Sequence, residues 1–140
     1  MTELPLSEQE KTVRKHLIKL AHNAKKNDSY VYISYQKLCD ACRPPRLNMQ
    51  NKADVLKIGE ILDNISKYEH RNGRPILSSL VVNKSSMQPG DGFYELCKEL
   101  FPKSGDLEKQ REERVDFGMV KECIEYWKNE ENHTKYKDIE

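Results

Sequence analysis

Residues 52–82 read KADVLKIGEILDNISKYEHRNGRPILSSLVV, a long helical pattern followed by the strongest strand candidate of the chain. Apolar residues recur at helical spacing over residues 52–72, which predicts a long amphipathic helix ended by Gly73. The stripe consists of Val55, Ile58, Leu62 and Ile65. The nearly continuous apolar run 76–82 predicts a strand that is buried on both faces.

The residues before this stretch predict two helices with a strand between them. Ser7 and Glu10 match a capping box at the start of a helix over residues 8–26. The β-branched and aromatic run 30–33 predicts a short strand. A short helix over residues 35–42 follows, and Pro44 ends it because proline cannot continue a helix.

The residues after this stretch predict a loop and further helices. Residues 83–92 have the composition of a loop, and apolar spacing predicts helices that begin at Phe93 and cover residues 115–127. Residues 129–140 lack apolar periodicity, so we expect a frayed C-terminal tail. The length of 140 residues favours one domain, which we expect over residues 1–128.

The order of these elements predicts an α+β, mostly helical fold. A short helix, a proline-containing turn, a longer helix and a strand resemble a winged helix-turn-helix core. The sequence adds an N-terminal helix and C-terminal helices to that core. In such a core, helix 52–72 is the groove-reading element and the loop near 83–88 is the wing.

Short motifs in this region resemble a known family. The runs SYQKLC (34–39) and KIGEIL (57–62), with Arg74-Pro75 before the apolar strand, look like the winged-helix domain of alkylguanine-DNA alkyltransferases. The resemblance covers roughly residues 30–85 and implies the architecture. The family's Pro-Cys-His-Arg motif is absent, because RPILSS (74–79) stands there, so the resemblance does not imply alkyl transfer.

A second pattern is similar to small uncharacterised bacterial and phage proteins. It consists of GRPILSSLVV (73–82), PGDGF (89–93) and IEYW (124–127). The similarity implies a bacterial or phage origin and brings no established chemistry.

The charged residues are unevenly distributed along a chain of net charge +1. Residues 1–75 hold 14 basic and 9 acidic residues, against 10 and 14 in residues 76–140. A basic excess around a helix-turn-helix-like segment predicts a non-catalytic DNA-binding or regulatory module with duplex DNA as partner. The expected phosphate contacts are Arg43, Arg46, Lys52, Lys57, Arg71 and Lys84, and the expected base contacts are Asn48, Gln50 and Asn51.

Two other function classes stay open. Asp54, Glu60 and Asp63 share the predicted recognition helix, and such a mixed-charge face also suits a protein-binding inhibitor or adaptor, for instance a phage protein that blocks a host enzyme. An enzyme would need Ser78 or Ser79 beside His70 and a carboxylate. No glycine elbow surrounds either serine, so the sequence favours a role without catalysis.

The sequence predicts neither a metal site nor a cofactor. Cys39 and Cys42 form a C-x-x-C, but no second ligand pair has comparable spacing. His16 and His22 are six residues apart and therefore lie on different faces of their helix. Unpaired cysteines fit a reducing compartment, and the sequence shows no signal peptide or membrane span, so we expect a cytoplasmic protein.

Overall fold

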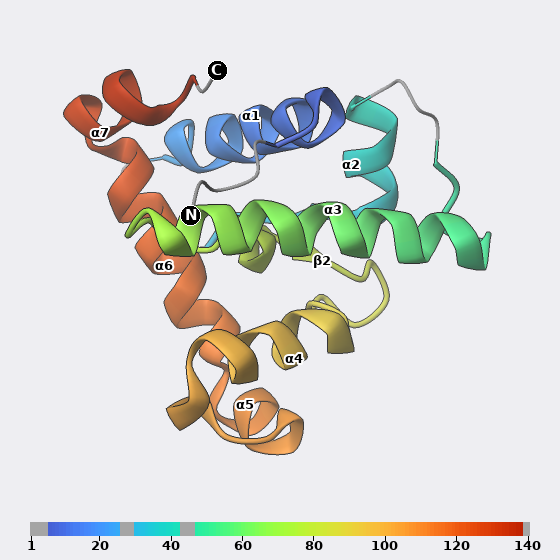
Figure 1. Ribbon diagram of the computed structural model, residues 1–140. Helices are drawn as coiled ribbons and strands as arrows, with labels where there is room; N and C mark the ends of the chain where they lie inside the picture. Colours follow the sequence, from blue (N-terminus) through green and yellow to red (C-terminus); the bar gives the residue numbers. More distant parts are fainter. Residues whose placement is uncertain (1–5, 26–29, 43–46, 139–140) are drawn as a thin grey trace.

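A 20-residue helix, α3 (Lys52–Arg71), lies between α1 (Glu8–His22) and α4 (Asp91–Leu100) (Figure 1). The computed structural model describes residues 6–25, 30–42 and 47–138. Helix α6 (Val115–Lys128) crosses one end of this stack and contacts α1 (Figure 1).

The other elements are short. They are α2 (Tyr35–Ala41), the 3₁₀ helices η1 (Leu77–Leu80) and η2 (Pro102–Ser104), α5 (Leu107–Glu113) and α7 (Glu130–Tyr136). Two strands, β1 (Ile33–Ser34) and β2 (Val81–Val82), pair in parallel, with Ile33 opposite Val81. The predicted α+β, mostly helical class is confirmed. Among the described helices, none has both the length and the apolar character of a membrane span.

Local signals in the sequence set the ends of several helices. The Ser7 hydroxyl accepts from the Glu10 amide at 3.1 Å, and Glu10 accepts from the Ser7 amide at 2.8 Å, which is the predicted capping box. Ser34 caps α2 by accepting from the Lys37 amide at 3.2 Å. Gly73 follows α3 with φ of +73°, a conformation in which glycine has no steric penalty.

The predicted strand over residues 76–82 was wrong for most of its length. Residues 77–80 form η1, and only Val81 and Val82 are strand. Serine hydroxyls provide local hydrogen bonds that let a buried turn compete with a strand. The Ser79 hydroxyl donates to the Ile76 carbonyl at 3.1 Å, and the Ser66 hydroxyl accepts from the Ser78 amide at 3.2 Å. The expected strand at 30–33 is likewise reduced to Ile33 and Ser34.

The segment predicted as a wing is a closed loop. The Asn83 amide donates to the Gln88 carbonyl and the Met87 amide donates to the Asn83 carbonyl, each at 2.8 Å. The loop then leads into α4, and no described residue forms a strand that returns along β2. The β1–β2 pair is also parallel, so the described residues show a mostly helical fold with a small parallel sheet, and the winged-helix core stays a prediction.

The C-terminal region is more ordered than the sequence predicted. The helix expected over 115–127 is confirmed as α6, and Arg114, with φ of +51°, separates it from α5. The expected fraying after residue 128 was wrong, because residues 130–136 form α7. The side chain of Asn129 caps this helix by accepting from the Asn132 amide at 3.1 Å.

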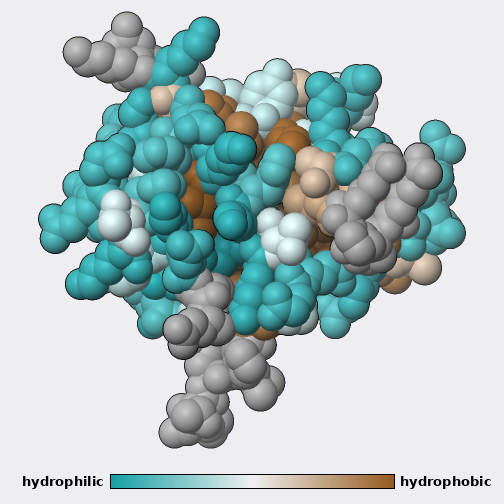
Figure 2. Space-filling model, turned by 90° about the horizontal axis from the view of Figure 1, so that it is seen from above, coloured by the Kyte–Doolittle hydropathy of each residue, from teal (hydrophilic) through white to brown (hydrophobic). Residues whose placement is uncertain are grey.

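The apolar core has a main part and a smaller part. The main cluster joins α1, α2, α3, η1 and α6, and it includes fully buried Leu17, Ile65 and Trp127. The smaller cluster contains Phe93 and Tyr94 of α4. Seen from above, the surface is mostly hydrophilic, with hydrophobic residues visible between charged and polar ones (Figure 2).

Three charged side chains are buried inside this apolar framework. Arg14 of α1, Glu69 of α3 and Arg74 are exposed by 1%, 0% and 8%. Glu69 uses one carboxylate oxygen for each arginine: Arg14 Nε donates to Oε1 at 2.8 Å and Arg74 Nε donates to Oε2 at 2.5 Å. This buried ion triad connects the N-terminal helix to the end of α3.

The C-terminal helix completes the triad. Arg14 donates to the carbonyl oxygens of Tyr136 at 2.8 Å and of Lys137 at 3.0 Å. Its guanidinium also lies 5.7 Å from the Trp127 ring centroid, and that of Arg74 lies 5.3 Å from the Tyr136 ring centroid. These contacts explain why a segment with little apolar periodicity is helical and packed.

We expect Glu69→Gln to lower the free energy of unfolding by about 3–5 kcal/mol, because it leaves two buried arginines without their carboxylate. Urea unfolding followed by circular dichroism measures the change. Glu131→Gln, an exposed change on α7, is the control and should shift stability by less than about 0.5 kcal/mol. Equal stability of the two variants would show that the triad does not support the fold.

Candidate functional site

A groove of about 630 Å³ runs along α3, between this helix and the segment that leads from β2 into α4. Its apolar lining residues are Met49, Val55, Leu56, Ile58, Leu62 and Phe93. Ligand sites commonly combine an apolar lining with a few polar groups, and a volume of roughly 300–1,000 Å³ is typical of them. We call this feature the α3 groove.

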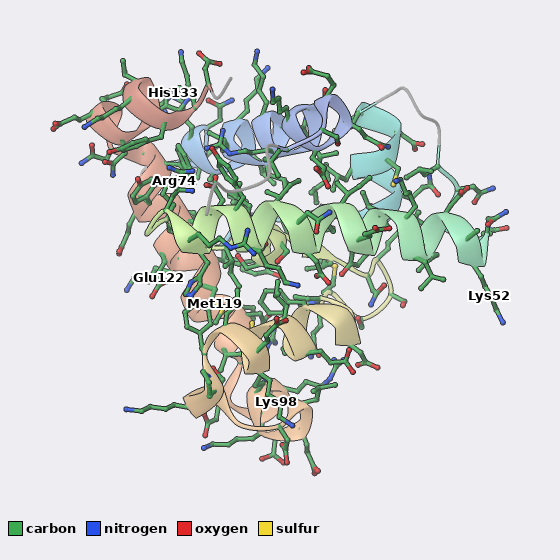
Figure 3. All side chains as sticks on the ribbon, in the orientation of Figure 1. Lys52, Arg74, Lys98, Met119, Glu122 and His133 are labelled. Carbon is green, nitrogen blue, oxygen red and sulfur yellow. The ribbon has the colours of Figure 1, made fainter. Side chains whose placement is uncertain are left out.

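Apolar side chains are uncovered at the mouth of the α3 groove. Leu56 is 74% exposed and Val55 is 44% exposed. The first turns of α3 project past α2 and α4, and Lys52 marks the projecting end (Figure 3). Val55 was predicted to belong to the apolar stripe of α3, but it is not buried, because the core does not extend to the first turn of this helix.

One wall of the groove is held by a tyrosine. The Gly90 amide donates to the Tyr35 hydroxyl at 3.0 Å, and this contact ties α2 to the loop before α4. Burial raises the pKa of Tyr35, so the hydroxyl stays protonated at neutral pH. A Cβ at position 90 would lie 3.4 Å from the Tyr35 hydroxyl oxygen, which is an ordinary van der Waals contact.

The other wall carries negative charge. Burial raises the pKa of Asp63, Lys67 opposes this rise, and Glu99 and Glu95 add to it. Lys67 interacts with both Asp63 and Glu99, because its Nζ also lies 3.8 Å from a carboxylate oxygen of Glu99. Carboxylates therefore outnumber cations beside the apolar part of the groove.

Two of the three residues predicted to read bases, Asn48 and Asn51, use part of their side-chain hydrogen-bonding capacity locally. Asn51 caps α3 by accepting from the Ala53 amide at 2.9 Å and from the Asp54 amide at 3.2 Å. The Asn48 side chain accepts from the Gln50 amide at 2.8 Å. Asn48, Gln50 and Asn51 are all exposed near the projecting end of α3, so the structure does bring them together.

The residues predicted to contact phosphates do not form one strip. Lys52 and Arg71 lie at opposite ends of α3, about 28 Å apart at 1.5 Å per residue. Lys57 is exposed near the projecting end and Lys84 lies on the closed loop. The remaining two, Arg43 and Arg46, lie outside the described residues.

Acidic residues interrupt the basic face of α3. At 100° per residue, Glu60 and Asp63 fall on the same side of the helix as Lys52, Lys67 and Arg71. A phosphate backbone placed along this face would meet carboxylates as well as cations. The described part of α3 therefore presents mixed charge.

The serines considered for catalysis are used in packing. Ser78 and Ser79 are 4% and 1% exposed, and the Ser66 hydroxyl donates to that of Ser78 at 2.8 Å. His70 packs edge-on against Phe101, with ring centroids 4.9 Å apart. Among the described residues, these side chains do not assemble a nucleophile, base and carboxylate.

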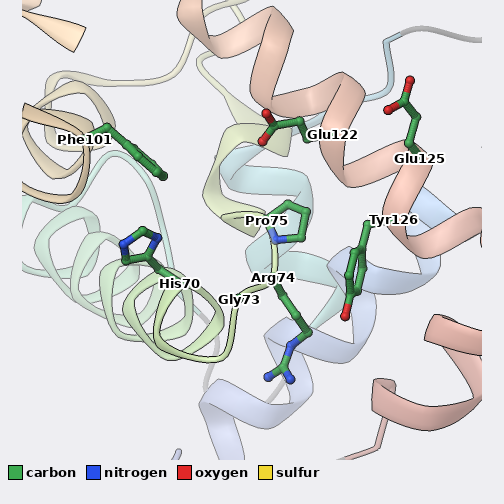
Figure 4. Close-up of a pocket in the computed structure, with 8 residues that line it drawn as sticks. All are labelled: His70, Gly73, Arg74, Pro75, Phe101, Glu122, Glu125 and Tyr126. Atoms are coloured by element: carbon green, nitrogen blue, oxygen red, sulfur yellow. The ribbon is translucent and has the colours of Figure 1, made fainter. Parts of the chain in front are cut away.

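A shallower pocket of about 580 Å³ lies at the other end of α3, lined by Arg74, Glu122, Glu125 and Tyr126 among others (Figure 4). The side chain of Arg74 points away from Glu122 and Phe101 (Figure 4). Since its Nε is bonded to Glu69, this cation belongs to the buried triad. The pocket mouth is left with two carboxylates, so it lacks the positive charge that an anionic ligand requires.

All four cysteines are buried and free of disulfides. Burial raises the pKa of Cys39 to about 11 and that of Cys97 and Cys123 to about 12. Burial also raises the pKa of Cys42. Because the thiolate is the reactive form, these groups have the character of packed thiols.

Comparisons with known proteins add no relative. No protein-family model, curated protein or solved structure matches this chain. The resemblances to alkylguanine-DNA alkyltransferases and to small bacterial and phage proteins therefore stay predictions.

The α3 groove was not predicted, because adjacent apolar residues on a helix do not show by themselves which side chains are exposed. Val55 and Leu56 are adjacent apolar residues on a helix, and adjacent side chains point about 100° apart. Ile61 and Leu62 are adjacent in the same way and are both buried, so this spacing alone does not identify an exposed pair. Leu56 is more exposed than Val55, at 74% against 44%.

The native protein should react slowly with a thiol reagent such as DTNB, because burial disfavours the thiolates. We expect native thiols to react at least about tenfold more slowly than the same chain in guanidinium chloride, where four should react. Absorbance of the released thiolate reports both rates. Rapid reaction of two native thiols that is lost in Cys39→Ser with Cys42→Ser would instead show that these two thiols are accessible.

Replacement of Asp63 should change stability with a defined pH dependence. The raised pKa means that the folded chain binds this proton more tightly than the unfolded chain, so stability falls as pH rises through the folded-state pKa. Asp63→Asn should therefore stabilise the protein at neutral pH, by no more than about 0.5 kcal/mol because solvent screens the half-exposed group.

Urea unfolding at neutral and acidic pH measures this difference. The gain from Asp63→Asn should disappear at acidic pH, where Asp63 takes up its proton in both states. Glu112→Gln, an exposed change on α5, is the matched control. Destabilisation by Asp63→Asn at neutral pH would contradict the assignment of a desolvation cost to Asp63.

Proposed function

We propose that this protein is a non-catalytic protein-binding module, an adaptor or inhibitor that receives an apolar and basic peptide segment in the α3 groove. The observation that carries the proposal is Leu56, which is 74% exposed on a groove with an apolar lining. Exposed apolar groups next to a concave apolar surface mark interaction sites. Four free, buried thiols support a cytoplasmic location for this activity.

Burial of the exposed apolar residues would drive the association. Full burial of a leucine side chain stabilises by about 1.5–3 kcal/mol, so covering the exposed part of Leu56 contributes roughly 1–2 kcal/mol. Val55 and Met49 extend the same surface. An amphipathic helix that inserts apolar side chains into the groove would use these contacts.

Charge complementarity specifies the partner further. Glu60 and Asp63 line the groove, and Glu95 and Glu99 lie close enough to raise the pKa of Asp63. Lysine or arginine residues beside the apolar anchors of the partner would neutralise these carboxylates. Such complementarity favours fast association and excludes acidic partners.

Peptide selection tests the proposal directly. A random peptide library displayed on phage is selected on the purified protein, and the most enriched peptide is synthesised for fluorescence polarisation. We expect apolar residues flanked by lysine or arginine. Leu56→Ser should weaken binding by at least about tenfold, since a central apolar anchor is lost. Asp63→Asn should weaken it less, through the lost charge.

Phe117→Ser provides the matched control. Phe117 is an apolar residue that is 42% exposed on α6, and it does not line the α3 groove. This change should leave peptide affinity within about twofold, as surface changes away from the site do. Enrichment of acidic peptides, or equal binding by Leu56→Ser, would contradict the proposal.

DNA binding is the second candidate, and one specific observation favours it. Asn48, Gln50, Lys52 and Lys57 are exposed together at the projecting end of α3. In a helix-turn-helix arrangement, with α2 before α3, the N-terminal residues of the second helix read base edges. This candidate therefore rests on the predicted winged-helix-like core.

Fluorescence anisotropy with labelled duplex DNA distinguishes the two candidates. If DNA is the partner, affinity should fall steeply as salt is raised from about 50 mM, and Lys52→Glu with Lys57→Glu should abolish binding. Leu56→Ser should then have a smaller effect than the double charge reversal. Absence of binding to duplex DNA at low salt would remove this candidate.

A further inference from the structure

Two histidines and a carboxylate meet where the end of α1 contacts the start of α7. They are His22, Glu130 and His133, and one ligand atom of each lies within 4.8 Å of the others. The two imidazole rings are stacked, with centroids 3.6 Å apart and an angle of 11° between their planes. His22 Nε2 lies 4.0 Å from a carboxylate oxygen of Glu130. We call these residues the His22 cluster.

The hydrogen bond of His22 sets which of its nitrogens is available. His22 Nδ1 lies 2.9 Å from the carbonyl oxygen of Trp127, and a carbonyl only accepts, so Nδ1 carries the proton. In the neutral ring, Nε2 then has a free lone pair directed at the cluster. Histidines that bind metals commonly donate their other N–H to a backbone carbonyl in this way.

The helix that supplies the other two ligands is fixed from both ends. Glu130 and His133 are three residues apart on α7, so they lie on the same face. Asn129 caps the start of α7, and Arg14 binds the carbonyl oxygens of Tyr136 and Lys137 at its end. The three ligand groups are thus held near one another before any ion binds.

We propose that the His22 cluster binds Zn²⁺ through His22 Nε2, His133 and a Glu130 carboxylate oxygen. Two imidazoles and a carboxylate are a common zinc donor set, with a fourth position for water. Bonds of about 2.0–2.1 Å at tetrahedral angles place ligand atoms about 3.4 Å apart, so only a small contraction of the cluster is needed.

Two physical consequences follow from the geometry. Imidazole lone pairs lie in the plane of the ring, so the stacked rings must tilt apart when both nitrogens bind one ion. The ion would also join α7 to α1, beside the bonds from Arg14, and a ligand that binds only the folded state raises its stability. Zinc is therefore a stabilising ion for the C-terminal helix in this proposal.

Titration of the full chain with zinc chloride, in competition with a chromophoric chelator, tests the site. We expect one ion to bind the native protein. His22→Gln and His133→Gln should each weaken binding by at least about tenfold. His16→Gln is the matched control, because His16 lies on the same helix outside the cluster. Circular dichroism confirms that each variant is folded.

A cysteine variant separates this site from the C-x-x-C pair. Cys39→Ser with Cys42→Ser should retain zinc binding, and Co²⁺ bound to the native protein should lack a thiolate charge-transfer band. Loss of binding in the cysteine variant with retention in His133→Gln would overturn the proposal. Absence of zinc binding to the native protein would overturn it as well.

Thermal unfolding adds a readout that depends on α7. Zinc should raise the melting temperature of the native protein and of His16→Gln, and it should not raise that of His133→Gln. An equal rise in all three proteins would place the ion elsewhere and overturn the proposal. This result does not depend on the α3 groove, so it is independent of the proposed function.

Discussion

The bonds of Glu69 to Arg14 and Arg74 constrain how α1, α3 and α7 pack together. One buried carboxylate cannot neutralise two buried guanidinium groups, and an unpaired buried charge is costly. The carbonyl oxygens of residues 136 and 137 accept from Arg14, and the rings of Trp127 and Tyr136 lie beside the two guanidinium groups. Among the described residues, Arg74 Nη2 is buried without a hydrogen-bond partner. Helix α7 therefore helps to stabilise the buried arginine charges that lie beside α1 and α3.

This constraint also shapes both candidate sites. The triad holds α3 at its C-terminal end, while the first turns project beyond the neighbouring helices and leave Leu56 exposed. The same docking of α7 brings His133 to His22. The α3 groove and the His22 cluster lie at opposite ends of the molecule, as the labels Lys52 and His133 show (Figure 3). A partner at one end would leave the other accessible.

Short-range signals predicted the helices well, and long-range contacts decided the rest. The capping box at Ser7, the cap at Ser34 and the stop at Gly73 depend on neighbouring residues, and the structure confirms them. The bond between Arg14 and Lys137 joins residues 123 positions apart, so no local sequence pattern predicts it. The His22 cluster was not predicted for the same reason, and because residues 129–140 were expected to fray. The run 76–82 was read as a strand because burial on all sides looks alike in a strand and in a buried turn.

The proposal of a protein partner in place of DNA rests on the position of the charges more than on their number. Residues 1–75 hold an excess of five positive charges, but Arg14 and Arg74 are inside the fold with Glu69 and cannot reach a phosphate. On the surface of α3, Glu60 and Asp63 lie among the lysines, and the pKa of Asp63 is raised first by burial and further by the neighbouring carboxylates of Glu99 and Glu95. A polyanion would increase the cost of charging Asp63, whereas a lysine or arginine of a protein partner would relieve it. The same side chain that opposes DNA along this helix therefore favours a basic, apolar peptide.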